Sequence, residues 1–124
     1  MKLLLDTHIL IWFLEGNPKL RPGWIDIIAD LHNTIYFSSV SIAEMAIKAS
    51  KNKLTYPENI VDICLNQGLT ELNLTGSHCL LLKDLPLLHN DPFDRLLIVQ
   101  SMVENLHIMS EDKIFKEYKV SLVI

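Results

Sequence analysis

The chain has 124 residues, of which 49% are hydrophobic and 21% are charged, and its formal net charge is −4. This length predicts a single domain spanning residues 1–124, and the composition excludes an intrinsically disordered chain. No apolar run approaches the roughly 20 residues that cross a bilayer, so we expect a cytoplasmic protein without a membrane segment. The negative net charge gives no indication that the protein as a whole binds nucleic acid.

The first predicted element is a strand, because residues 3–5 form a short apolar run that is too short for an independent helix. Such runs are typical of strands buried on both faces in the middle of a parallel sheet. Asp6 follows directly, and it therefore lies at the carboxyl end of a central strand, where open α/β sheets bind ligands. Asp6 and Thr7 also suit the N-terminus of the helix predicted over residues 8–14.

The rest of the chain alternates short apolar runs with amphipathic segments. Further strands are predicted over residues 34–37, 69–74, 107–109 and 120–124. Further helices are predicted over residues 24–31, 42–50, 57–66, 76–84, 92–105 and 113–118. This alternation predicts an α/β fold with a mainly parallel five-stranded sheet and helices on both faces.

Cysteines and histidines do not predict a zinc site. Cys64 and Cys79 form no C-x-x-C pair, and we expect both to be buried free thiols in a reducing compartment. The histidines show no H-x-x-x-H or mixed His/Cys spacing. These histidines are His8, His32, His78, His89 and His107.

Two acidic residues near predicted helix starts have local explanations. Ser41 and Glu44 fit an S-x-x-E capping box, and Glu44 precedes Lys48 by one helical turn. Asp91 is the predicted N-cap of the helix that begins at Pro92, which places Asp94 in its first turn. Acids at both places are also favoured by the helix dipole.

The acidic residues share a topology that these local explanations do not account for. Asp6 and Asp112 follow strands, whereas Glu44 and Asp94 open helices that run back from the same sheet edge, so all four approach one cleft. Two unit charges about 4 Å apart repel by roughly 4 kcal/mol at an effective dielectric constant of 20. Mg²⁺ or Mn²⁺ would relieve this repulsion, and phosphoryl transfer is the chemistry that uses such ions. Glu111, beside Asp112, is expected to face solvent.

Four segments together resemble the PIN-domain family, and within it the VapC-type toxins of type II toxin–antitoxin systems. They are residues 3–8, 38–48, 89–98 and 109–112. The resemblance implies a Rossmann-like sheet and a Mg²⁺- or Mn²⁺-dependent endoribonuclease that cleaves cellular RNA. It also implies a cognate antitoxin that neutralises the toxin, a homodimer and a toxin–antitoxin hetero-oligomer.

The resemblance also assigns roles to the acidic residues. Asp6, Glu44, Asp94 and Asp112 match the acidic quartet of the family. As hypotheses, Asp6 and Asp94 bind the main metal ion directly, and Asp112 binds that ion or a second, weaker one. Glu44 would orient or deprotonate the attacking water.

Secondary candidates flank these positions. Asp91 falls where this subgroup has an extra acid, and Ser110 stands where a threonine is common. Thr7 follows the first acid, and His8 stands where many relatives have asparagine. Arg95 is expected to pair with Asp91 or to contact the substrate.

Two surfaces have open interpretations. Lys48, Lys51 and Lys53 form either a solvated helix end, favoured by the helix dipole, or a grip on the RNA backbone. Residues 9–14 are apolar on every side. Part of that surface is predicted to receive an antitoxin segment, with a basic side chain reaching the acidic cleft.

Other metal-dependent folds fit less well. A receiver domain requires adjacent acids after its first strand, and a haloacid-dehalogenase phosphatase requires D-x-D, whereas Asp6 is followed by Thr7 and His8. Two alternatives stay open: a structure-specific DNA nuclease, and a catalytically weak, toxin-like interaction module.

Overall fold

The computed structural model describes residues 1–123, which form a five-stranded parallel sheet in the order β3-β2-β1-β4-β5. The strands are β1 (Lys2–Leu5), β2 (Thr34–Ser38), β3 (Thr70–Leu72), β4 (His107–Met109) and β5 (Ser121–Leu122). The predicted parallel α/β fold is therefore confirmed. Of the strand predicted over residues 120–124, Ile124 lies outside the described residues.

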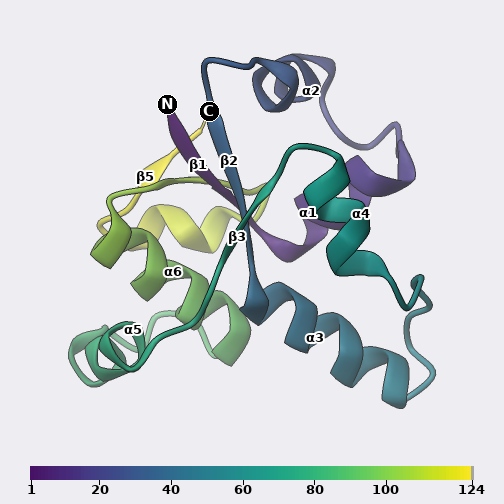
Figure 1. The fold of residues 1–124 in the computed structure, drawn as a ribbon. Coiled ribbons are helices and arrows are strands. Elements are labelled where there is room, and N and C mark those ends of the chain that lie inside the picture. Colours follow the sequence, from purple (N-terminus) through teal and green to yellow (C-terminus); the bar gives the residue numbers. More distant parts are fainter. Residues whose placement is uncertain (124) are drawn as a thin grey trace.

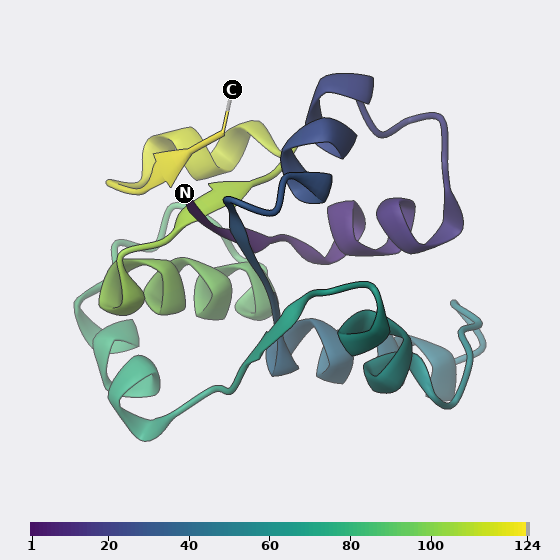
Figure 2. The ribbon, with the colours of Figure 1, turned by 45° about the horizontal axis from the view of Figure 1, so that its top comes forward.

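Helices cover both faces of this sheet (Figures 1 and 2). The α-helices are α1 (Thr7–Glu15), α2 (Pro22–Ala29), α3 (Ser39–Ser50), α4 (Ile60–Asn66), α5 (Gly76–Leu80) and α6 (Pro92–Glu104). Two 3₁₀ helices are η1 (Leu81–Asp84) and η2 (Lys113–Glu117). In both views α1, α2 and α4 lie on one side of the sheet, and α5 and α6 lie on the other. No helix within residues 1–123 is long and apolar enough to cross a membrane.

The central strand explains why the core has two sides. Successive side chains of a strand point to opposite faces, and Leu3, Leu4 and Leu5 are all fully buried. Leu3 and Leu5 pack in the cluster that contains Trp24 of α2, whereas Leu4 packs in the cluster that contains Leu97 of α6. Because β1 is covered on both faces, its sequence is a continuous apolar run rather than an alternating one.

Several predicted boundaries are wrong by a few residues, and side-chain hydrogen bonds account for two of them. The helix predicted over residues 42–50 begins at Ser39, because Ser38 caps it by accepting a hydrogen bond from the Val40 amide at 3.0 Å. The helix predicted over residues 24–31 spans Pro22–Ala29, and the Asn33 amide donates to the Ile27 carbonyl at 2.9 Å just beyond it. Leu31, the last residue of the predicted helix, lies beyond the observed one and is 98% exposed.

The remaining differences are shortened or tightened elements. The helix predicted over residues 57–66 begins at Ile60, and the helix predicted over 76–84 ends as an α-helix at Leu80 and continues as η1. The segment 113–118 forms the 3₁₀ helix η2. Cys64 is buried as predicted, but Cys79 is exposed because α5 directs the neighbouring His78 into the protein instead.

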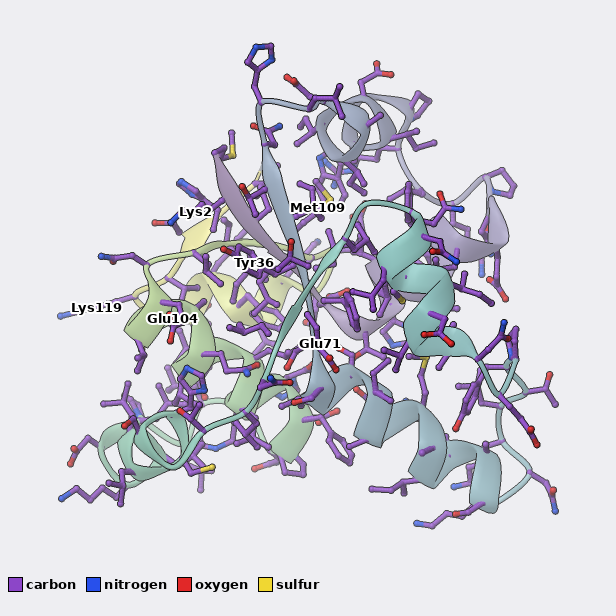
Figure 3. All side chains as sticks on the ribbon, viewed as in Figure 1. Lys2, Tyr36, Glu71, Glu104, Met109 and Lys119 are labelled. Carbon is purple, nitrogen blue, oxygen red and sulfur yellow. The ribbon has the colours of Figure 1, made fainter. Side chains whose placement is uncertain are left out.

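The strand order reverses next to β1. The chain passes from β1 to β2 and β3 on one side, and then places β4 on the other side of β1. In Figure 3, Tyr36 of β2 and Met109 of β4 mark the two strands that flank β1. Ligands of open α/β sheets bind at this kind of switch point, beyond the carboxyl ends of the strands. The residues that follow β1 and β4 are Asp6 and Ser110.

Candidate metal centre

Asp6 joins the ends of the two strands at the switch point. Its Oδ1 accepts a hydrogen bond from the Ile9 amide at 2.8 Å, which caps α1, and its Oδ2 accepts one from the Ser110 hydroxyl. The Ser110 hydroxyl oxygen in turn accepts from the Asp112 amide at 3.0 Å. Asp6 is only 4% exposed. The capping interpretation of Asp6 is therefore confirmed, whereas its role in binding a ligand stays a prediction.

Asp94 is brought to the same edge by the start of α6. Asp91 is the N-cap, as predicted, and its Oδ1 accepts from the amides of Phe93 at 2.8 Å and Asp94 at 3.3 Å. The backbone amides of Phe93 and Asp94 at the start of α6 are thus hydrogen-bonded without the Asp94 carboxylate. That carboxylate instead meets the imidazole of His89, with 2.7 Å between Asp94 Oδ2 and His89 Nε2.

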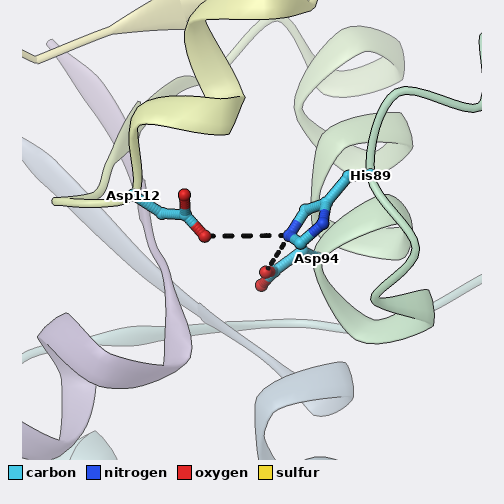
Figure 4. Close-up of side chains that lie close together, drawn as sticks. All are labelled: His89, Asp94 and Asp112. Carbon is cyan, nitrogen blue, oxygen red and sulfur yellow. Dashed lines mark hydrogen bonds and ion pairs between the residues drawn. The ribbon is translucent and has the colours of Figure 1, made fainter.

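Asp112, which follows β4, approaches the same nitrogen of that imidazole (Figure 4). The distance from Asp112 Oδ2 to His89 Nε2 is 3.7 Å. One ligand atom from each of His89, Asp94 and Asp112 lies within 4.8 Å of the others. Asp112 also caps η2, since its Oδ1 accepts from the Ile114 amide at 3.0 Å.

Burial raises the pKa values of Asp6 and Asp94. The pKa of Asp6 lies above its ordinary value because of burial, which outweighs the hydrogen bonds from Ser110 and the Ile9 amide. Burial likewise raises the pKa of Asp94 to about 6, against the opposing hydrogen bond with His89. The negative charges of Asp91 and Asp6 raise the pKa of Asp94 further, so Asp6 and Asp94 repel each other when both are ionised.

Glu44 lies in the second turn of α3, so the predicted capping box is wrong. The Ser41 hydroxyl accepts a hydrogen bond from the Thr7 hydroxyl at 2.9 Å, which joins α3 to the residue after Asp6. The predicted pair with Lys48 is confirmed, at 2.8 Å between Lys48 Nζ and Glu44 Oε2. Within the described residues, Glu44 Oε1 is buried and has no hydrogen-bond partner. A buried oxygen of this kind is suited to a cation or an ordered water.

Arg95 does not pair with Asp91. Its guanidinium donates instead to the carbonyls of Leu85 at 3.2 Å and Pro86 at 2.9 Å, and it lies 3.2 Å from the Tyr118 hydroxyl. The arginine is therefore engaged with the loop that precedes α6. Lys48 is likewise held by Glu44, which leaves Lys51 and Lys53 as the exposed lysines at the end of α3.

His89 is the residue at this centre that sequence analysis missed. Its partner Asp112 comes from another element, so no regular histidine spacing marks the pair. The indication that was present is its place in the His89–Arg95 segment, two residues before the cap of α6. The other histidine near Asp6, His8, is exposed and lies 6.3 Å from the Trp12 ring.

The donor set fits a divalent cation. Asp94 and Asp112 supply hard carboxylate oxygens of the kind that Mg²⁺ and Mn²⁺ take in proteins, and Asp6 is near enough for its charge to raise the pKa of Asp94. Within residues 1–123, Glu44 and Asp6 are not among the residues whose ligand atoms lie within 4.8 Å of one another. A bound cation would also favour the ionised forms of Asp6 and Asp94, which burial disfavours.

Comparison with known proteins places the chain in a family. Three similar solved structures each cover 99% of this chain, with 97–98% of the other chain covered. They are VapBC2 of Rickettsia felis bound to a promoter DNA fragment (21% identity, TM-score 0.75), DNA-bound VapBC of Salmonella typhimurium (14%, 0.71) and VapBC-1 of nontypeable Haemophilus influenzae (19%, 0.69). No curated protein sequence matches. At these identities the structural similarity shows the fold, whereas the sequence matches the PIN domain over residues 3–120. The chain therefore belongs to the PIN domain family.

Proposed function

We propose that this protein is a Mg²⁺- or Mn²⁺-dependent endoribonuclease that acts as a VapC-type toxin. The observation that carries the proposal is the convergence of Asp6, Asp94 and Asp112 at the switch point of a PIN-domain sheet. The three acids come from the ends of β1 and β4 and from the start of α6, and two of them have raised pKa values. Perturbed carboxyl groups gathered at a ligand-binding edge are typical of active sites.

Asp6, Asp94 and Asp112 would hold the cation in this proposal. When bound, the cation supplies Lewis-acid chemistry, which polarises the scissile phosphate and neutralises charge that develops there. Asp6 is pre-positioned for this role because the Ile9 amide and the Ser110 hydroxyl fix both of its oxygens. The Asp94 carboxylate is not needed as a helix cap, because Asp91 supplies the cap of α6.

Glu44 would act as the general base. Lys48 fixes its Oε2 at 2.8 Å, and its Oε1 is left without a partner in the described residues. In the proposed step the oxygen of a water molecule forms a bond to phosphorus, and the proton of that water passes to Glu44 Oε1. The opposite P–O ester bond of the RNA breaks, its electron pair stays on the departing ribose oxygen, and that oxygen takes up a proton from solvent, so that two RNA fragments result.

An antitoxin is the proposed protein partner. The similar solved structures are VapBC assemblies, which supports the proposal that a cognate antitoxin neutralises this chain within a hetero-oligomer of toxin homodimers. On this chain, an apolar pocket lies between α1, α3 and α4. Its lining includes Ile11, Leu14, Met45, Tyr56 and Ile60. Ile9 and Leu10 of α1 belong to the core, so the surplus apolar surface is confined to the later part of the predicted 9–14 segment.

The nuclease activity is tested with total cellular RNA and purified protein in Mg²⁺, in Mn²⁺ and in EDTA. We expect discrete fragments that disappear with EDTA and with the Asp94→Asn variant. A matched RNA and DNA strand pair should show cleavage of the RNA only. Cleavage of the DNA strand alone would replace the proposal with a DNA nuclease, and a folded protein that neither binds metal nor cleaves would leave an interaction module.

A further inference from the structure

The loop before α6 is held by a buried hydroxyl. The Tyr118 hydroxyl accepts hydrogen bonds from the amides of Leu88 at 3.1 Å and His89 at 2.9 Å, and donates one to the Pro86 carbonyl at 2.9 Å. Tyr118 itself is only 6% exposed. The backbone of His89 is therefore fixed by a residue that follows η2, the element that Asp112 caps.

The imidazole is fixed as well as the backbone. Arg95 holds the preceding carbonyls of Leu85 and Pro86, and the edge of the His89 ring packs against Phe115 with 6.5 Å between ring centroids. The side chain of His89 is 21% exposed. A side chain held by its backbone, by its ring contact and by the loop around it needs little reordering to bind a ligand.

His89 Nε2 faces two carboxylates of the proposed metal centre. It lies 2.7 Å from Asp94 Oδ2 and 3.7 Å from Asp112 Oδ2, and Figure 4 shows both oxygens directed at this one nitrogen. A cation shared by Asp94 and Asp112 would therefore lie within reach of a ring nitrogen. Neutral imidazole is a ligand for transition metals, whereas Mg²⁺ takes oxygen ligands and keeps its waters.

We propose that His89 is a nitrogen ligand of the metal centre, and that it makes the centre select Mn²⁺ over Mg²⁺. This inference rests on the proposed function, which supplies the metal ion. It adds His89 as a ligand of that ion and a preference of the centre for Mn²⁺. Tyr118 and Arg95 are positioning residues for this histidine, since they act on the loop and not on the ion.

Pulsed electron paramagnetic resonance of Mn²⁺ bound to the whole chain tests the ligand directly. We expect a ¹⁴N modulation from a coordinated imidazole in the unchanged protein, and a changed pattern when histidine is labelled with ¹⁵N. The modulation should disappear in His89→Ala and in His89→Gln, and it should persist in His32→Ala. His32 is a matched control because its side chain is 96% exposed and its Nδ1 lies 3.0 Å from a different carboxylate, that of Asp30.

Metal affinity tests the preference. We expect His89→Ala to raise the Kd for Mn²⁺ about tenfold or more, the range seen when groups around a metal centre are removed, while the Kd for Mg²⁺ changes by less than about threefold. Tyr118→Phe should raise the Kd for Mn²⁺ in the same direction and by less. Circular dichroism on each variant verifies that the chain is folded.

The outcomes separate this inference from the proposed function. Mn²⁺ that binds without ¹⁴N modulation overturns the nitrogen ligand and leaves the carboxylate centre standing. The same holds if the modulation survives in His89→Ala and is lost in His8→Ala. Equal rises in the Kd values for both ions overturn the preference. A folded protein that binds no Mn²⁺ overturns the inference and the metal-dependent nuclease together.

Discussion

Two histidine–carboxylate pairs in this chain have different surroundings. His78 of α5 is 1% exposed, its Nδ1 accepts from the Thr75 amide at 3.0 Å, and its Nε2 lies 3.0 Å from Glu104 of α6. His89 meets Asp94 and Asp112 with one nitrogen, Nε2. Because Nδ1 of His78 is an acceptor, the proton of the neutral ring lies on Nε2 and is donated to Glu104.

The difference lies in how much negative charge each histidine faces. Neutral His78 satisfies every group around it: one cap amide and one half-exposed carboxylate. His89 faces one oxygen from each of two carboxylates, with Asp6 close enough to raise the pKa of Asp94. An excess of anionic groups, rather than the histidine itself, distinguishes a candidate metal centre from a structural contact.

Of the variants that test this difference between the two histidine sites, Asp94→Asn should have the largest effect, which is on RNA cleavage. We expect RNA cleavage in Mn²⁺ to fall by more than about 100-fold, because the loss of groups that merely support metal ligands already costs 10- to 100-fold. Gel analysis of fragment formation measures it. Full activity in the folded variant would contradict the role of Asp94.

The same variant tests the raised pKa without metal. A folded-state pKa of about 6, above the ordinary 3.8, means that the protonated form of Asp94 stabilises the fold at low pH. That contribution is fully present below pH about 4 and is lost as the pH rises through about 6. The difference in Tm between Asp94→Asn and the unchanged protein in EDTA should therefore grow from pH 4 to pH 7, in favour of the variant. A constant difference would contradict the raised pKa.

Metal binding should depend on the same proton. Since a cation binds ionised carboxylates, the Kd for Mn²⁺ is expected to rise by at least about tenfold for each pH unit below 6, because the pKa of Asp94 is about 6 and that of Asp6 is also raised. Calorimetric titration at several pH values measures this slope. Asp94→Asn should flatten it, and an unchanged slope in that variant would assign the proton to another group.

Some features of the sheet edge were predictable because they depend on chain order and local capping. The run from Leu3 to Leu5 predicts a central strand, and the Asp91-Pro92 pair predicts the start of α6. These two features place Asp6 and Asp94 at one edge. The catalytic roles of Asp6, Glu44, Asp94 and Asp112 stay predictions, since the structure reports their placement and not their chemistry.

Other features were not predictable because they depend on contacts between distant segments. Ser41 pairs with Thr7 across 34 positions of sequence, and Tyr118 holds the loop that carries His89 across 29. No local pattern encodes such pairs. The capping box expected at Ser41 failed for this reason: Ser38 caps α3, and the Ser41 hydroxyl meets Thr7.

His78→Ala should affect stability and leave the metal centre intact. The variant removes the buried ring, the hydrogen bond that Nδ1 accepts from the Thr75 amide in the α5 capping box, and the contact with Glu104. We expect a loss of about 2 kcal/mol in the free energy of unfolding. Urea denaturation measures it. The Kd for Mn²⁺ should stay unchanged, and a rise comparable to that in His89→Ala would mean that the two histidine pairs do not differ as described.

The smallest effect is expected at Glu111, beside Asp112. Its carboxylate receives both Arg21 Nε and Nη2 at 2.8 Å, and the guanidinium also lies 4.3 Å from the Trp24 ring centroid. Both partners of this ion pair are exposed, so Glu111→Gln should cost about 0.2–1 kcal/mol of stability.

Glu111→Gln and Asp112→Asn each remove one negative charge from neighbouring positions of one loop, which makes them matched variants. Physiological salt screens exposed charges beyond about 8 Å, so Glu111→Gln should change the Kd for Mn²⁺ by less than about twofold. Asp112→Asn should raise it about tenfold or more, because it removes an oxygen that faces His89 and Asp94. Titration of both variants side by side decides between the two interpretations of this loop. Equal rises would show that the acids act through their summed field, whereas a rise confined to Asp112→Asn would support a ligand at that position alone.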